Sequence, residues 1–119
     1  MSPQQGRTGY HKEVSERIPE NVAEKLRDIV HQHDALSAQL LDPEILADHR
    51  KVTALSIKKS AIAPLVEQFT VYETVLTQEQ ECEEVLKGDD KELAALAKEE
   101  LPELDDRLSS LTEIIQKQL

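Results

Sequence analysis

Three motifs within residues 40–104 decide the fold: L-L-D-P-E-I-L-A-D at residues 40–48, A-P-L-V-E-Q-F at residues 63–69, and G-D-D-K-E-L-A-A-L-A-K-E-E-L at residues 88–101. The first motif predicts a helix start at Asp42-Pro43-Glu44. Aspartate can cap free N–H groups, proline fits the first turn, and glutamate favours the positive helix end. Asp48 offers a second cap, so a short turn over 43–47 should precede the main helix. Gly88 offers that helix a left-handed stop.

The main helix is predicted to run from about Asp48 to Lys87, because apolar residues recur along it at spacings of three and four. These residues form a seam, a stripe on one helix face, made of Val52, Leu55, Ile62, Leu65, Val66, Phe69, Tyr72, Leu76, Cys82 and Leu86. Some 40 residues rising about 1.5 Å each span roughly 60 Å, which implies an extended molecule. Pro64 should kink the helix, because it removes the bond to the Ser60 carbonyl.

A second helix precedes the main one and a third follows it. The preceding helix is predicted from about Pro19, which suits the first helical position, to Leu41. Its seam comprises Val22, Leu26, Ile29, His33, Leu36 and Leu40. The following helix should start at Asp89, with Glu92 as its capping-box partner, and Pro102 predicts a bend or break within it. Its seam comprises Leu93, Ala97, Leu101, Leu104, Leu108, Leu111 and Ile115.

These three seams predict an all-α fold, an extended antiparallel three-helix bundle with coiled-coil-like packing. The composition agrees, because the chain is 39% apolar but only 3% aromatic and contains 3 glycines for tight turns. We expect one helical domain over residues 18–119 and a flexible N-terminal tail over residues 1–17. From the helix lengths, the three helices should overlap only around residues 59–66.

The formal net charge of −10 is unevenly distributed. Residues 1–63 hold nine Lys/Arg and nine Asp/Glu, whereas residues 64–119 hold five Lys/Arg and fifteen Asp/Glu. The acidic half repels phosphate, so it argues against a nucleic-acid groove there and suits a basic protein partner, or simply solubility.

The cellular location is expected to be cytoplasmic. Cys82 is the one cysteine, so it cannot form an internal disulfide, which fits a reducing compartment. No apolar run approaches the ~20 residues of a membrane span. The N-terminus also lacks the apolar region of a secretion signal.

No catalytic, cofactor-binding or metal site is predicted. His31 and His33 are two residues apart and face different directions on a helix, whereas helical metal sites favour a spacing of four. The acidic runs 79–84 and 99–106 should be solvated, because leucines occupy the inner faces. Glycosidase chemistry or a helical di-metal enzyme would need those carboxylates turned inward against a pocket. Cys82 is interpreted as a seam residue, because the neighbouring charges of Glu79, Glu81, Glu83 and Glu84 oppose a thiolate there.

Arg50, Lys51 and Lys58 form a small basic stripe near the start of the main helix. Lys51 and Lys58 lie two turns apart and share a face. This stripe is a candidate contact for RNA phosphate, and the alternative is ordinary surface charge.

From Val22 to Leu119 the chain resembles the N-terminal domain of bacterial class 1 peptide-chain release factors. The motifs that carry the resemblance are L-L-D-P-E-I-L-A-D at residues 40–48, A-L-S at 54–56, A-P-L-V-E-Q-F-T-V-Y at 63–72, G-D-D-K-E-L-A-A-L-A-K-E-E-L-P-E-L at 88–104, and the closing L-S-S-L-T-E-I-I-Q-K-Q-L. The D-P-E and G-D-D-K-E-L segments look more like the factor that reads UAA and UAG than its UGA-reading relative. Residues 57–59 are Ile-Lys-Lys and depart from the family pattern.

The resemblance implies a role in binding rather than catalysis. In the family this domain projects toward the stalk base of the large ribosomal subunit, where it meets protein and rRNA, and responds to the class 2 release-factor GTPase. The Gly-Gly-Gln tripeptide that triggers peptide release is absent from these 119 residues. We therefore expect no enzyme, no small-molecule substrate and no membrane partner. The alternative is a helical adaptor or coiled-coil module unrelated to translation.

Overall fold

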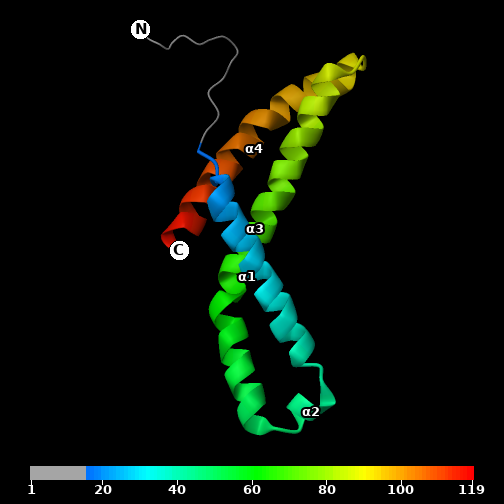
Figure 1. The fold of residues 1–119 in the computed structure, drawn as a ribbon. Helices are drawn as coiled ribbons and strands as arrows, with labels where there is room; N and C mark the ends of the chain where they lie inside the picture. Colours follow the sequence, from blue (N-terminus) through cyan, green and yellow to red (C-terminus); the bar gives the residue numbers. More distant parts are fainter. Residues whose placement is uncertain (1–15) are drawn as a thin grey trace.

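The computed structural model describes residues 16–119, which form four helices and no strand. The helices are α1 (Glu20–Gln39), α2 (Pro43–Leu46), α3 (His49–Lys87) and α4 (Lys91–Lys117). Helix α3 runs the length of the molecule, α1 crosses it near its middle, and α4 returns from its far end (Figure 1). The predicted all-α bundle is confirmed.

The molecule is extended along α3. Its principal dimensions are 61, 36 and 18 Å, and its Cα radius of gyration is 19.8 Å. A compact domain of this length would have a radius near 13 Å. The 39 residues of α3 account for the long axis, since they span roughly 58 Å at the standard helical rise.

Aspartate caps begin three of the four helices. The Asp42 carboxylate accepts the backbone N–H of Glu44, and Asp48 accepts those of Arg50 and Lys51. These two caps confirm the short helix before the main one. The third cap corrects the prediction by one residue, because Asp90 rather than Asp89 accepts from the first turn of α4, through the N–H groups of residues 92 and 93.

Two other predicted helix boundaries are also corrected. Pro19 precedes α1 as its N-cap instead of occupying the first turn. Gly88 ends α3 in an extended conformation, with φ −84° and ψ −178°, and not in the left-handed one. Asp90 caps α4 two residues later, so the chain passes from α3 to α4 without the left-handed residue that commonly ends a helix. A Cβ at Gly88 would lie 3.4 Å from the Val85 carbonyl oxygen, an ordinary contact.

Neither internal proline breaks its helix. Pro64 lies within α3 and Pro102 within α4, and both are exposed. Figure 1 shows α3 changing direction about where α1 crosses it, and α4 following a curved path. A proline on the outer side of a bend is tolerated, because the carbonyl that loses its partner faces water.

The core lies where α1, α3 and α4 meet. Its completely buried large side chains, each under 2% exposed, come from all three helices: Leu26, Phe69, Val75, Leu108, Thr112 and Ile115. The overlap of the helices therefore falls around residues 65–75 of α3, not at the predicted 59–66. Helix α2 and its flanking turns separate the ends of α1 and α3, which moves the α1 contact further along α3. Helix α4 follows a curved path, so its C-terminal Gln118 reaches only Gln68.

The seams are confirmed at most positions, with informative exceptions. Leu93 was placed in a seam but is 50% exposed, because only α3 lies beside it at this end of the molecule. Conversely, Ala23, Val75 and Thr112 are buried although the seams omitted them. Residues 27–64 contain no buried side chain. The arm made of the second half of α1, α2 and the first half of α3 is therefore a thin helix pair.

Candidate functional site

The basic stripe, Arg50, Lys51 and Lys58, lies on the first half of α3 in this thin arm. All three side chains are exposed. Seven residues are almost two full turns, so Lys51 and Lys58 share a face and lie about 10 Å apart along the axis. The cap at Asp48 fixes this end of α3, because its carboxylate holds the backbone N–H groups of Arg50 and Lys51.

The charges of this stripe are available to a partner. Within residues 16–119, none of its three cations forms an ion pair. Lys58 borders a shallow groove between α1 and α3 of about 470 Å³, lined also by Gln32, Ala35, Leu36, Ala61 and Ile62. The arrangement can attract an anionic surface, and it contains no group placed for acid, base or nucleophilic chemistry.

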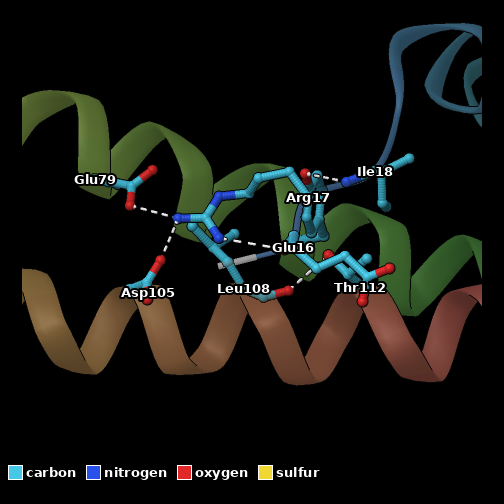
Figure 2. A network of polar contacts seen from close by, with 8 residues as sticks. Glu16, Arg17, Ile18, Glu79, Asp105, Leu108 and Thr112 are labelled. Atoms are coloured by element: carbon cyan, nitrogen blue, oxygen red, sulfur yellow. Dashed lines mark hydrogen bonds and ion pairs between the residues drawn. The ribbon is translucent and has the colours of Figure 1, made fainter. Parts of the chain in front are cut away.

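Arg17 forms a partly buried ionic bridge between α3 and α4 (Figure 2). Its Nη2 donates to Glu79 Oε2 at 2.8 Å and to Asp105 Oδ1 at 2.7 Å. The three side chains are only 19%, 12% and 14% exposed. Burial would lower the pKa of Arg17, but the two carboxylates more than compensate and raise it.

This bridge was missed in the sequence, because a single arginine in a polar tail carries no periodic signal. The predicted tail lies outside the described residues except at Glu16 and Arg17. Glu79 and Asp105 belong to acidic runs expected to be solvated, and they instead turn toward Arg17. The next residue is also held, since the N–H of Ile18 donates to the Tyr72 hydroxyl at 3.1 Å. Together these contacts dock the start of α1.

The buried Thr112 is satisfied within its own helix. Its hydroxyl donates to the Leu108 carbonyl at 2.7 Å, so a polar side chain with 0% exposure carries no unmet hydrogen bond there (Figure 2). This local bond explains how a threonine replaces an apolar residue in the core.

Cys82 is a buried seam residue, as expected. Its thiol is 3.9 Å from a carboxylate oxygen of Glu100. Burial raises the pKa of Cys82, and the negative charges of Glu100 and Glu81 raise it further. A thiol held protonated in this way is a poor nucleophile.

The structure brings together no metal site among residues 16–119, where no group of three or more His, Cys, Asp or Glu is placed to hold an ion. His33 is half-buried in α1, while His31 and His49 are exposed. None of the described helices is both long enough and apolar enough to span a membrane.

Comparison with known proteins identifies the family. The PCRF domain family matches residues 29–119. The chain is 38% identical over 92 residues to "Peptide chain release factor 1" of a Nitratiruptor species, covering 77% of this chain and 25% of that protein. It is 39% identical over 98 residues to the protein of the same name from Helicobacter pylori, covering 82% and 27%. The chain thus spans about a quarter of the length of the curated relatives it matches. No solved structure matches it.

Proposed function

This chain belongs to the PCRF domain family, and from that membership we propose that it acts as the N-terminal domain of a class 1 translation termination factor. The family match carries the proposal, and it agrees with the motifs in residues 40–101. The relatives' name, "Peptide chain release factor 1", and the D-P-E and G-D-D-K-E-L segments support a full-length factor that reads UAA and UAG. Such a factor works in the cytoplasm.

The role we propose is binding and not catalysis. No Gly-Gly-Gln tripeptide occurs in the 119 residues, and the described surfaces offer exposed charge in place of a reactive cluster. The domain would therefore contribute ribosome affinity while other parts of the factor read the codon and release the peptide.

The proposed contact is the stalk base of the large ribosomal subunit. The basic stripe at Arg50, Lys51 and Lys58 suits rRNA phosphate, because its cations are exposed and bound to no carboxylate among residues 16–119. The acidic half, residues 64–119, suits a basic protein of the same region. An extended molecule of 61 Å can present these two surfaces to different partners. The class 2 release-factor GTPase would act on the factor while this contact is made.

Competition on ribosomes tests the proposal. The purified chain, in excess, should slow the association of full-length release factor 1 with a termination complex. The effect should be weak and decline with salt, because the chain lacks the avidity of the whole factor and surface charges are screened beyond ~8 Å. The chain alone should release no peptide. Absence of competition at low salt, or stop-codon-dependent release by the chain alone, would refute the proposed role.

A further inference from the structure

Helices α3 and α4 leave an apolar groove on a side to which α1 contributes no residue. Two adjoining hollows form it. The larger has a volume of about 540 Å³ near the α3–α4 turn and is lined by residues including Val85, Leu93 and Leu96. The smaller, of about 310 Å³, includes Val71 and Ile114. Arg107 borders both hollows, so they meet at this residue of α4.

The apolar residues of this groove are conspicuously uncovered. Eight large apolar side chains of the described residues are exposed, and four of them line the groove: Val71 at 38%, Leu93 at 50%, Leu96 at 56% and Ile114 at 42%. Scattered exposed leucines need no explanation, but two such pairs in adjoining hollows, Leu93 with Leu96 and Val71 with Ile114, indicate a binding surface. From residue 93 to 114 the two hollows together span roughly 32 Å of α4, the length of a helix of about 20 residues, and Glu100, Glu103 and Arg107 border them between the two apolar pairs.

The charge on the rim selects the class of partner. Four carboxylates border the two hollows, those of Glu81, Glu100, Glu103 and Asp106, against the one guanidinium of Arg107. This excess of negative charge repels nucleic acid and anionic lipid surfaces and attracts Lys and Arg. The apolar floor requires a partner with apolar anchors as well.

We propose that this groove binds a basic amphipathic helix of about 20 residues. Its apolar residues, spaced at i, i+3, i+4 and i+7, would lie on Leu93, Leu96 and Ile114, while its lysines or arginines would meet the carboxylates of the rim. The added helix would complete a three-helix bundle on this side of the α3–α4 pair, as α1 does at the crossing. The inference depends on the groove alone, so it holds whether or not the chain acts in translation.

A fluorescence-anisotropy titration tests the proposal with a labelled synthetic peptide of about 20 residues that has leucines at the spacing above and lysines elsewhere. Two control peptides have the same length. One is a shuffled sequence that scatters the leucines around the helix, and the other has glutamates in place of the lysines. The basic amphipathic peptide should bind more tightly than either control peptide, and substitutions in the groove should weaken its binding.

Matched protein variants localise the binding. Leu96→Asp should weaken binding about tenfold or more, because it places a polar group on the apolar floor. Leu46→Asp is its control, since Leu46 on α2 is 54% exposed against 56% for Leu96 and the added charge is the same. Glu103→Lys should also weaken binding, whereas Glu113→Lys, exposed and outside both hollows, should not. Circular dichroism confirms that each variant is folded.

Three outcomes would overturn the proposal. The first is equal affinity of the Leu96→Asp and Leu46→Asp variants for the basic peptide. The second is binding of either control peptide as tight as that of the basic amphipathic one. The third is a self-associating chain that Leu96→Asp converts to a monomer in sedimentation, because the occupant would then be a second copy.

Discussion

The Arg17 bridge provides the most quantitative test of how the three helices are held together. Arg17→Met removes the guanidinium but keeps an apolar side chain of similar reach. Glu79 and Asp105 would then face each other across α3 and α4 without the cation that now lies 2.8 and 2.7 Å from them. The repulsion between these two partly buried carboxylates would then no longer be offset by the Arg17 cation.

The expected loss in the free energy of unfolding follows from the burial of the three side chains. An exposed ion pair contributes about 0–1 kcal/mol, whereas breaking a buried one costs about 3–5 kcal/mol. With exposures of 19%, 12% and 14%, this site is closer to the buried case. We expect a loss of about 2–3 kcal/mol, which is large against the ~5–15 kcal/mol stability of a typical domain.

The assay is urea unfolding followed by far-UV circular dichroism. Arg27→Met is the matched control, because Arg27 is 42% exposed and pairs with Glu20 and Glu73 at the surface, so its loss should stay below about 1 kcal/mol. Adding Glu79→Gln and Asp105→Asn to Arg17→Met should recover part of the loss by removing the repulsion. A cost for Arg17→Met no greater than that for Arg27→Met would refute the idea that the bridge docks the start of α1.

Further predictions concern the core, the thiol and the thin arm. Leu104→Ala should lower the free energy of unfolding by ~2–5 kcal/mol, because Leu104 is 6% exposed, and urea unfolding showing a change under about half a kcal/mol would contradict its burial. The Cys82 thiol has a higher pKa in the folded chain than in the unfolded one. Its contribution to the free energy of unfolding is therefore full below about pH 8.5 and is lost as the pH rises through the raised pKa. The free energy of unfolding of the wild type should therefore fall more than that of Cys82→Ala as the buffer becomes alkaline. Parallel plots of the two free energies against pH would contradict this. Amides of residues 30–60 should exchange hydrogen faster than those of residues 65–80, because 27–64 lack a buried side chain; uniform protection would disprove the thin arm.

Local signals in the sequence predicted the helices well. The caps at Asp42 and Asp48 and the long apolar seam of α3 depend on neighbouring residues only, and the structure confirms them. The cap of α4 was predicted one residue too early, because Asp89 and Asp90 are adjacent and either can cap a helix. The conformation of Gly88 was wrong because a glycine can end a helix in more than one conformation.

The placement of helices against one another was harder to predict. Helix lengths alone put the crossing near residues 59–66, but the α2 connection and the curved path of α4 moved it to about 65–75. Arg17 and Thr112 escaped notice because their burial depends on partners distant in sequence or on a bond within the helix. Periodicity also assigned Leu93 to the core, since it cannot show that no third helix covers the end of the α3–α4 pair.

The candidate contact residues come from the sequence, and the structure adds their surroundings. It places Arg50, Lys51 and Lys58 exposed on one end of α3, outside any ion pair of residues 16–119. Their contact with the ribosome stays a prediction, because it involves a partner outside this chain.

The most direct test of the proposed ribosome contact measures the association rate of a full-length release factor that carries this domain. Arg50, Lys51 and Lys58 are changed together to glutamate, and the control changes Lys91, Lys98 and Lys117, three exposed lysines elsewhere that alter the net charge equally. The account predicts slower association, or a blunted response to the class 2 GTPase, for the first variant alone, with stop-codon choice unchanged. Equal rates and GTPase responses for wild type and both variants would contradict it.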